Sequence, residues 1–318
     1  SNLLSATLRD NYVAEIKSDY QHARELHHGK KGQGARYTLA QARGHGLKTD
    51  WKNYTPPKPN FIGVKELRDY SLAEISEYID WSPFFQTWEL AGRYPKILQD
   101  EVFGETARNL FADAQAMLKK IIAEKWLSAN AVFGLFPANS EAVNGTNGDD
   151  IEIYSDESRS KAAMTWHNLR QQMVRPEDKP NLCLADFIAP KDSGVADYIG
   201  AFAVTAGIGI DARVAEFEKQ NDDYNSILLK ALADRLAEAF AELLHARVRR
   251  EFWGYAPDEA LDNDALIAEK YRGIRPAPGY PACPEHTEKG ALFALLDAPL
   301  NAGITLTESY AMLPTAAV

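Results

Sequence analysis

The sequence predicts an α+β fold with a largely antiparallel sheet. Strand-like runs follow one another around turn residues, long segments with helical periodicity separate them, and strands and helices do not alternate regularly. With 318 residues, of which 45% are hydrophobic, the chain can bury a sizeable core. The sequence contains neither an internal repeat nor a GxGxxG or GxxxxGK[ST] phosphate-binding loop.

The beginning of the chain is polar and weakly patterned. We therefore expect residues 1–50 to form an N-terminal arm, with a basic, glycine-rich loop at 27–34, and residues 51–318 to form the folded body. The segment YTPPKP at 54–59 cannot be helical, because each proline restricts its own backbone and that of the residue before it. It predicts an extended strap that leads into the body.

The first regular elements of the body are a helix and a hairpin. Residues 101–126 show helical periodicity. The apolar run at 131–138 predicts a buried strand, the alternating run at 151–154 predicts its partner, and residues 140–150 have turn chemistry. A further helix is expected at about 162–173.

The second half of the body adds strands and the longest helix. Strands are expected at 181–189 and 198–206, joined by a Lys-Asp-Ser-Gly turn, and a last strand at 303–312. The longest helix is expected at about 222–251. Its apolar stripe consists of Leu228, Leu232, Leu236, Phe240, Leu243 and Leu244.

Another face of this helix carries Asp234, Glu238 and Glu242 at i, i+4 spacing. Like charges at this spacing cost about 0.2–0.5 kcal/mol per pair, and Lys230 and Arg235 can offset part of that cost. A solvated face is one interpretation. The other starts from Glu238, whose alanine neighbours allow close approach, so that its carboxylate would pair with a cation from the protein or from a ligand.

The stretch RPAPGYPACPEH at 275–286 combines stiffness with varied chemistry, and we call its first part, residues 275–280, the proline rail. Its prolines hold Arg275 and Ala277 extended, so little remains to be ordered on binding. Arg275 can grip a carboxylate with two parallel hydrogen bonds. Gly279 permits close backbone approach, and Tyr280 offers a ring face and a hydroxyl. The proline rail suits a flat heterocycle with a carboxylate, but a rigid connector with an ordinary Arg275 salt bridge explains the same residues.

The residues after the proline rail allow several interpretations. Pro284 predicts the first residue of a helix, with Glu285 and Glu288 in its first turn. Cys283 and His286 form a C-x-x-H pair, which is half of a metal site, but zinc needs three or four protein ligands. A Cys–His nucleophile is a second interpretation, and a structural cysteine is a third.

A second segment of interest, YIDWSPFFQTWEL, lies at 78–90. Ser82 followed by proline predicts a helix start, with Ser82 as the cap. Asp80 lies between two large apolar residues just before it. It is either a second cap or a buried acceptor for a cationic group, and the cap is less needed because Ser82 is already in place.

Charge and cysteine content exclude several classes of protein. A net charge of −10 argues against general nucleic-acid binding, and no apolar run approaches the ~20 residues that span a bilayer. The two cysteines, Cys183 and Cys283, cannot form a disulfide framework. We therefore expect a cytoplasmic protein in a reducing compartment.

Several motifs together carry a resemblance to a known family. They are YIDWSPFF, GLFPAN with DDIEIY, CLADF with DYIGAFAVT, ADRLAEAF and RPAPGYPACPEHTEK. In this order they resemble the C-terminal activation domain of cobalamin-dependent methionine synthase, from about residue 50 to the end of the chain. The RxxxGY core of the last motif is similar to the S-adenosylmethionine signature of that family.

The resemblance implies a C-shaped single domain in which helices surround a bent, largely antiparallel sheet. Such a domain binds S-adenosylmethionine and supplies its methyl group to reactivate cob(II)alamin as methylcobalamin, with one electron from flavodoxin or a related flavoprotein reductase. The parent methyltransferase, an enzyme of methionine biosynthesis, holds its cobalamin and its zinc in other domains. The implied partners are the cobalamin-binding domain and the flavoprotein, and a monomer is expected.

The resemblance also assigns roles within the proline rail. Arg275 would hold the carboxylate of S-adenosylmethionine, and the backbones of Ala277 and Gly279, with Tyr280 beside them, would meet adenine and ribose. Outside the rail, Asp80 would accept the amino group.

Glu238 would lie near the cationic end of the ligand, with Asp234 behind it. The family continues past residue 318 into an aromatic segment with a tyrosine pair at the ligand site. The resemblance therefore implies that part of the site's wall lies outside this chain. Because a cobalamin-ligating D-x-H-x-x-G loop and a cysteine-rich zinc site are also missing from the sequence, we expect no turnover by this chain alone.

A module that docks on proteins without a small ligand is the alternative from another functional class. Basic residues gather at Lys30 and Lys31 and at Arg247, Arg249 and Arg250. These patches would suit an acidic flavodoxin. The three arginines also complement the negative C-terminal end of their own helix, which is the simpler explanation.

Overall fold

The structure is a computed structural model, which describes residues 7, 9–29, 35–143, 146–280 and 282–318. Its α-helices are α1 (Arg9–Gly29), α2 (Leu39–Gly44), α3 (Leu72–Ser76), α4 (Ser82–Thr87), α5 (Gly104–Glu124), α6 (Ile210–Lys219), α7 (Asp223–Arg247), α8 (Asn263–Ile267), α9 (Lys289–Leu296) and α10 (Ala298–Ala302). Its strands are β1 (Gly63–Leu67), β2 (Ser128–Val143), β3 (Thr146–Tyr154), β4 (Ala162–Trp166), β5 (Asp197–Ile208), β6 (Thr305–Leu306) and β7 (Met312–Leu313). The short helices are η2 (Lys96–Gln99), η3 (Leu184–Phe187), η4 (Lys191–Ser193) and the π-helical η5 (Val248–Phe252).

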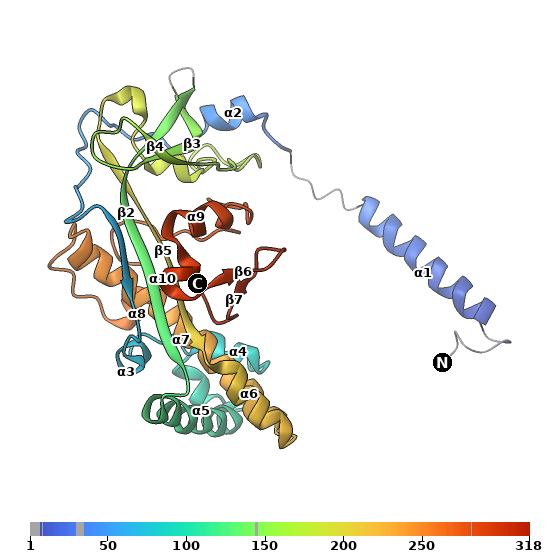
Figure 1. The fold of residues 1–318 in the computed structure, drawn as a ribbon. Coiled ribbons are helices and arrows are strands. Elements are labelled where there is room, and N and C mark those ends of the chain that lie inside the picture. The colour runs from blue at the N-terminus through green and yellow to red at the C-terminus, as the bar shows by residue number, and fades with distance from the viewer. Residues whose placement is uncertain (1–6, 8, 30–34, 144–145, 281) are drawn as a thin grey trace.

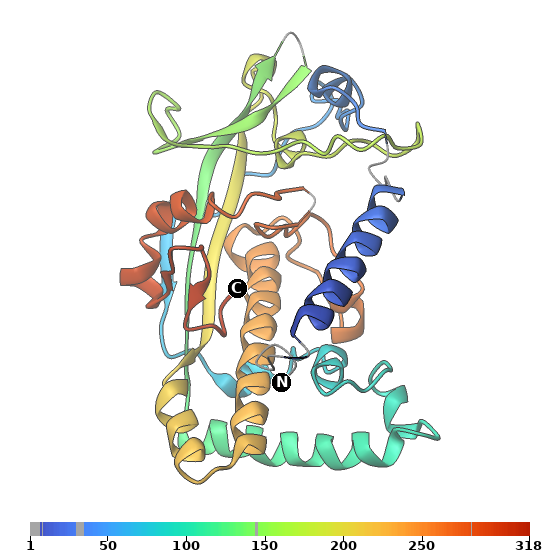
Figure 2. The same ribbon diagram turned by 90° about the vertical axis from the view of Figure 1, so that its right-hand side faces the viewer.

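One antiparallel sheet organises the body, with β2 as its longest strand (Figure 1). β1 and β5 both pair with residues 131–135 of β2, β3 pairs with the end of β2, and β4 pairs with β3. All of these pairings are antiparallel, as predicted. Seen from the side, the upper strands and α5 project in the same direction from the two ends of the sheet, which gives the body its C shape (Figure 2).

The sheet is buried on both faces. Ala131, Phe133 and Leu135 of β2 belong to a core that includes residues of α5 and α7, whereas Val132 and Phe136 belong to a second core that includes residues of α9 and α10. Because successive side chains of a strand point to opposite faces, the two cores share one strand. This explains why residues 131–138 of β2 form an unbroken apolar run in the sequence.

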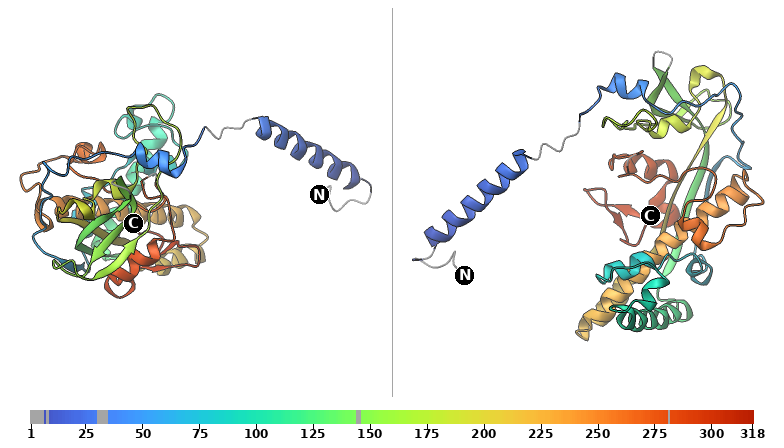
Figure 3. Two further views of the ribbon diagram at one scale, coloured as in Figure 1. Left: turned by 90° about the horizontal axis from the view of Figure 1, so that it is seen from above. Right: turned by 180° about the vertical axis from the view of Figure 1, so that it is seen from behind.

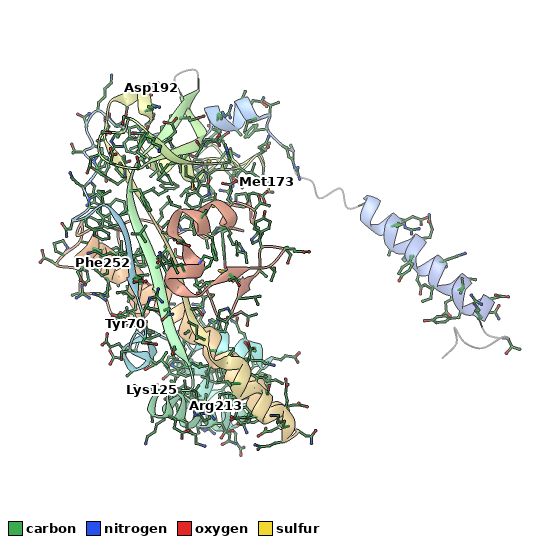
Figure 4. The ribbon with its side chains drawn as sticks, in the orientation of Figure 1. Tyr70, Lys125, Met173, Asp192, Arg213 and Phe252 are labelled. Atoms are coloured by element: carbon green, nitrogen blue, oxygen red, sulfur yellow. The ribbon has the colours of Figure 1, made fainter. Side chains whose placement is uncertain are left out.

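The helix α7 is the longest in the described part of the chain, and it packs against β5 (Figure 2). It begins after Asp222, whose carboxylate accepts the N–H of Asn225 at 3.0 Å. It continues into η5, which includes Phe252 (labelled in Figure 4). Phe252 packs on Phe133 of β2 with 4.6 Å between ring centroids. The whole predicted apolar stripe is buried, so this prediction is confirmed.

Three predicted elements are wrong. The helix expected at 162–173 is replaced by β4, because pairing with the free edge of β3 overrides the local helix preference. The strand expected at 181–189 contains η3, where the Asp186 carboxylate accepts the N–H of Cys183 at 3.0 Å and tightens the chain into a turn. The turn expected at 140–150 is mostly strand, since β2 and β3 extend into it.

The end of the chain also differs from expectation. Pro284 does not begin a helix: α9 starts at Lys289, because Glu285 accepts the N–H of Thr287 and Glu288 accepts the N–H of His167. The last predicted strand is reduced to the two-residue strands β6 and β7.

The N-terminal part contains more structure than predicted. α1 was missed because its apolar residues are few, and it stands apart from the body (Figure 3). Thr38 caps α2 by accepting the N–H of Gln41, and Arg43 of α2 pairs with Asp149 of β3 at 2.6 Å. Residues 54–59 form neither helix nor strand, so the prediction that they are not helical is confirmed. The domain boundary at residue 50 stays a prediction, and residues 30–34 of the predicted basic loop lie outside the described residues.

Among the helices that the structure describes, none combines the length and the apolar character needed to cross a bilayer.

Candidate functional site

The proline rail meets α7 through Arg275. Its Nη2 donates a hydrogen bond to Oε2 of Glu242 at 2.9 Å, and the two side chains are only 24% and 11% exposed. In the described part of the chain, Nη1 of Arg275 and Oε1 of Glu242 are buried without a hydrogen-bond partner. Buried polar atoms are rarely left unpaired, because losing water without replacement costs about 1–3 kcal/mol per group. The pair is therefore incomplete as it stands.

A tight turn closes the proline rail. The N–H of Gly279 donates to the carbonyl of Cys283 at 2.8 Å, and the N–H of Cys283 donates to the carbonyl of Tyr280 at 2.9 Å. Gly279 has a φ of +106°, and a Cβ atom there would lie 2.5 Å from the ring of His286. Both the backbone conformation and the space require glycine. Tyr280 projects outward and is 65% exposed.

A buried polar network holds the segment that leads into the proline rail. Arg249 is fully buried, donates to both carboxylate oxygens of Glu259 at 2.6–3.0 Å, and donates through Nη1 to Nδ1 of His245 at 2.7 Å. The ring of Tyr271 lies 4.1 Å from the Arg249 guanidinium and contacts the His245 ring edge-on. Tyr271 precedes Arg275 by four residues, so the network fixes the approach to the proline rail against the end of α7.

Burial sets the protonation states in this network. Burial, together with the charges of Arg249 and Arg275, lowers the pKa of His245 to about 2, so its imidazole is neutral and can accept the Arg249 hydrogen bond. Burial also raises the pKa of Glu242, and the two arginines oppose this shift. Glu242 is therefore a carboxyl group whose charge depends on its arginine partners.

Asp80 lies in the loop before α4 and is half-buried. Its Oδ1 accepts the N–H of Ser82 at 2.9 Å, whereas Oγ of Ser82 accepts the N–H of Tyr94 at 3.2 Å. The prediction that Ser82 caps this helix is wrong, because Ser82 is the first residue of α4 and Asp80 accepts its N–H. Asn263 donates to the carbonyl of Ile79 at 3.1 Å, which ties this loop to α8.

The structure brings the proline rail to α7 at Glu242. Glu238 and Asp234 lie on the same helix but are exposed, and Asp234 pairs with Arg235 at 2.5 Å. No hydrogen bond or ion pair between described residues joins Asp80, Glu238 or Asp234 to the rail. Their roles in a ligand site stay predictions. Glu242 was noticed in the sequence only as one member of a charged face, and no local pattern distinguishes it from its neighbours.

The two cysteines are both buried and free. Burial raises the pKa of Cys283 to about 11 and that of Cys183 to about 12. A catalytic cysteine needs a lowered pKa, so the local chemistry opposes the interpretation of Cys283 and His286 as a nucleophilic pair. Among the residues that the structure describes, no group of three or more His, Cys, Asp or Glu side chains is arranged to hold a metal ion.

The predicted basic docking patch is wrong for Arg249, which is fully buried in its ion pair with Glu259. Arg247 pairs with Glu251 at 2.8 Å, and Arg250 is exposed. Lys30 and Lys31, the other predicted patch, lie outside the described residues.

The chain is similar to a known protein family and to a solved structure. Residues 71–318 match the family described as the activation domain of vitamin B12-dependent methionine synthase. The chain is also similar to a crystal structure of the MetH reactivation domain bound to AdoHcy, with 56% sequence identity and a TM-score of 0.84. That match covers 89% of this chain and 85% of the other. It confirms the α+β fold with a bent antiparallel sheet.

Proposed function

The chain belongs to the family of activation domains of vitamin B12-dependent methionine synthase, and from this premise we propose that its proline rail binds S-adenosylmethionine. It is thus a domain of a methyltransferase. The solved relative binds AdoHcy, which is S-adenosylmethionine without the transferred methyl group. The observation that carries the proposal is the incomplete Arg275–Glu242 pair, whose unpaired guanidinium nitrogen lies at the start of the proline rail.

Within the proline rail, Arg275 would donate to the ligand's carboxylate through Nη1. A hydrogen bond between two charged groups is about twice as strong as a neutral one, which suits the strongest anchor of the ligand. The backbones of Ala277 and Gly279 would contact adenine and ribose, because neither residue has a side chain that prevents close approach. Tyr280, which is exposed, would cover the ligand from the outside.

Acidic residues would recognise the cationic groups of the ligand. Asp80 uses one oxygen for the N–H of Ser82, and its other oxygen would accept the ligand's amino group. Glu238 is an exposed carboxylate one helical turn from Glu242, and it would lie near the sulfonium. Asp234 is one turn further along α7 and would act only at longer range.

The proposed reaction needs groups that this chain does not provide. Cobalamin held by another domain of the enzyme would accept the methyl group, after one electron from flavodoxin or a related flavoprotein has reduced the cob(II)alamin form. The carbon–sulfur bond would break with its electron pair remaining on sulfur, which leaves S-adenosylhomocysteine on the proline rail. The residues of this chain would hold and orient the donor. The outward position of Tyr280 supports a ligand that is open to the partner domain.

Calorimetric titration of the chain with S-adenosylmethionine tests the proposal. Saturable binding that is lost in Arg275→Ala is the expected result. Absence of binding would instead favour a docking module without a small ligand. A longer chain, in which the family's aromatic segment follows residue 318, should bind more tightly if that segment completes the wall of the site.

A further inference from the structure

We propose that Glu242 is a positioning residue, which holds one edge of the Arg275 guanidinium so that its free N–H groups face the ligand's carboxylate. The inference deepens the proposed function and rests on it. Glu242 would not contact the ligand. Its effect would be transmitted through the 2.9 Å bond between its Oε2 and Nη2 of Arg275.

Arginine has enough N–H donors for Arg275 to bind Glu242 and a ligand carboxylate at the same time. A guanidinium has five N–H groups in one plane, and a carboxylate is gripped best by two of them in parallel. Glu242 engages Nη2 only, and Nη1 is buried without a partner in the described part of the chain. The side chain therefore keeps donors for a second carboxylate while the first one fixes its plane.

Glu242 is the fixed member of the pair. It projects from α7, most of whose residues in this region are buried, and its residue is itself only 8% exposed. Arg275, in contrast, lies in a segment without helix or strand structure. An unsupported arginine would sample many side-chain conformations, and ordering it on binding would cost conformational entropy. Contact with Glu242 removes much of that cost before the ligand arrives.

A second contact fixes the direction from which Arg275 approaches. Tyr271 lies against Arg249 and His245, which are anchored at the end of α7. The segment from Tyr271 to Arg275 is thus held at both of its ends by the same helix. This two-point attachment defines where the guanidinium lies, and neither point uses the donors that remain free.

The charges around Glu242 agree with a supporting role. Arg275 and Arg249 stabilise its charge, while Glu259 and Glu269 oppose it, and the adjacent His245 is neutral. A competing explanation is that Glu242 occupies Arg275 in place of the ligand and must be displaced. The two explanations predict opposite changes in S-adenosylmethionine affinity when the Glu242 carboxylate is removed. Binding weakens if Glu242 supports Arg275, and it tightens if Glu242 competes with the ligand.

The test uses two ligands and three variants of the chain. S-adenosylmethionine is compared with decarboxylated S-adenosylmethionine, which keeps the sulfonium and the amino group but lacks the carboxylate. Glu242→Ala should weaken binding of S-adenosylmethionine about tenfold and leave binding of the decarboxylated ligand within about twofold. Glu242→Gln, which keeps a hydrogen-bond acceptor, should restore most of the loss. Glu251→Ala, which removes an exposed carboxylate from an arginine pair away from the proline rail, is the matched control and should change neither affinity.

Each other outcome overturns the inference. Equal weakening for both ligands would show that Glu242 acts on the fold as a whole, and tighter binding in Glu242→Gln would show that it competes with the ligand. Thermal unfolding identifies a variant that does not fold. If Glu242→Ala fails in this way, Glu242→Gln decides alone: a partial weakening that is confined to S-adenosylmethionine supports the inference, and unchanged or tighter binding contradicts it. If the unmodified chain binds neither ligand, the proposed function itself is wrong and the inference falls with it.

Discussion

The side chains of Arg170 and Arg275 are both mostly buried, but they differ in how many of their hydrogen-bond donors have a partner. Arg170 donates through Nε to Asp149 at 2.8 Å and through both Nη atoms to the Asp186 carboxylate at 2.6 and 2.7 Å. Its Nη1 also donates to the carbonyl of Asn181 at 2.9 Å. Among the described residues, Arg275 has one hydrogen-bond partner, Glu242, and its Nη1 has none. The comparison separates an arginine that is part of the fold from one that is held ready for another molecule.

The Arg170 cluster is closed on every side. Its side chain is 1% exposed, and Arg43 of α2 shares Asp149. Burial alone would lower the pKa of Arg170, but Asp186 and Asp149 outweigh burial and raise the pKa above its usual value. Even the backbone is tightly fitted, because a Cβ atom at Gly46 would lie 2.7 Å from Nη1 of Arg170. A cluster with no free donor in the described residues offers nothing to a ligand, so its contribution is to stability.

The largest effect should come from breaking the closed cluster. We expect Arg170→Met to lower the free energy of unfolding by about 3–5 kcal/mol, because Asp149 and Asp186 would be left buried without a cation. Urea denaturation measures the change. Arg213→Met, which removes an exposed i, i+3 pair, should cost no more than about 0.5 kcal/mol. A loss of the same small size for Arg170→Met would remove the distinction between the two arginines.

Breaking the Arg275–Glu242 pair should affect ligand binding more than stability. Arg275→Ala should weaken S-adenosylmethionine binding by about 2–4 kcal/mol, since a buried charge-assisted pair would be lost. Its unfolding free energy should fall by about 1–3 kcal/mol, because the buried Glu242 carboxylate would lose its partner. This loss should be smaller than that of Arg170→Met, which leaves two carboxylates unpaired. Calorimetry and urea denaturation measure the two quantities. Arg272→Ala, which removes a nearby exposed arginine, should leave the affinity unchanged.

The cysteines extend the comparison to reactivity. Cys183 lies in the closed cluster and Cys283 follows the proline rail, and burial raises their pKa values to about 12 and about 11. At pH 8 the thiolate fraction of Cys283 should be about 100-fold below that of an exposed thiol, and that of Cys183 lower still. Iodoacetamide labelling followed by mass spectrometry should therefore be slow for both and slower for Cys183. Fast labelling of Cys283 in the folded chain would revive the nucleophile interpretation.

The pH dependence of stability tests the network under the proline rail. The pKa of His245 is about 2 in the folded chain and about 6.5 when unfolded. Below pH 6.5 the unfolded chain binds a proton at His245 that the folded chain does not bind. As the pH is lowered through this range, the unfolding free energy should therefore fall by about 1.4 kcal/mol per pH unit. Denaturation at several pH values should show this slope in the wild type and lose it in His245→Asn.

His167 provides the opposite sign as a control. Its pKa is raised by the hydrogen bond with Asp150, so it stabilises the fold at low pH, and this contribution is lost as pH rises through the folded pKa. This contribution is complete below the unfolded pKa of about 6.5, so His167→Gln should lower the unfolding free energy by a constant amount below that pH and leave the slope there unchanged. An unfolding free energy that equals the wild-type value at pH 5 would contradict the assignment.

The smallest expected effect concerns ligand charge. If Glu238 lies near the sulfonium, Glu238→Gln should weaken binding of S-adenosylmethionine a few-fold more than binding of S-adenosylhomocysteine, which lacks that charge. Competition titrations with both ligands measure the ratio. An equal effect on both would assign Glu238 to the shared amino group or to the fold.

Sequence patterns predicted elements whose periodicity is set by burial. The helix α7 and the strand β3 could be predicted because the apolar residues of each recur with the period of one buried face. The segment at 162–173 was misread because its pairing with β3 depends on a distant edge. η3 was missed because the Asp186 bond that forms it leaves no periodic pattern.

The same limit applies to the candidate site. The stiffness of the proline rail and the donors of Arg275 follow from residue type alone. The partner of Arg275 does not, because Asp234, Glu238 and Glu242 are equivalent in sequence, and only the packing selects Glu242. The burial of Arg249 could not be predicted from the sequence either, because its partner Glu259 lies on an irregular segment that has no periodic pattern.

The shared strand β2 makes the two cores one cooperative unit. At 16 residues it is about 50 Å long, and its alternate side chains pack into opposite cores. Neither core can melt without exposing the strand that supports the other, so calorimetry should show a single heat-absorption peak for the body. A ligand bound on the proline rail would then slow amide hydrogen exchange along the whole of β2, including its far end beside the Arg170 cluster.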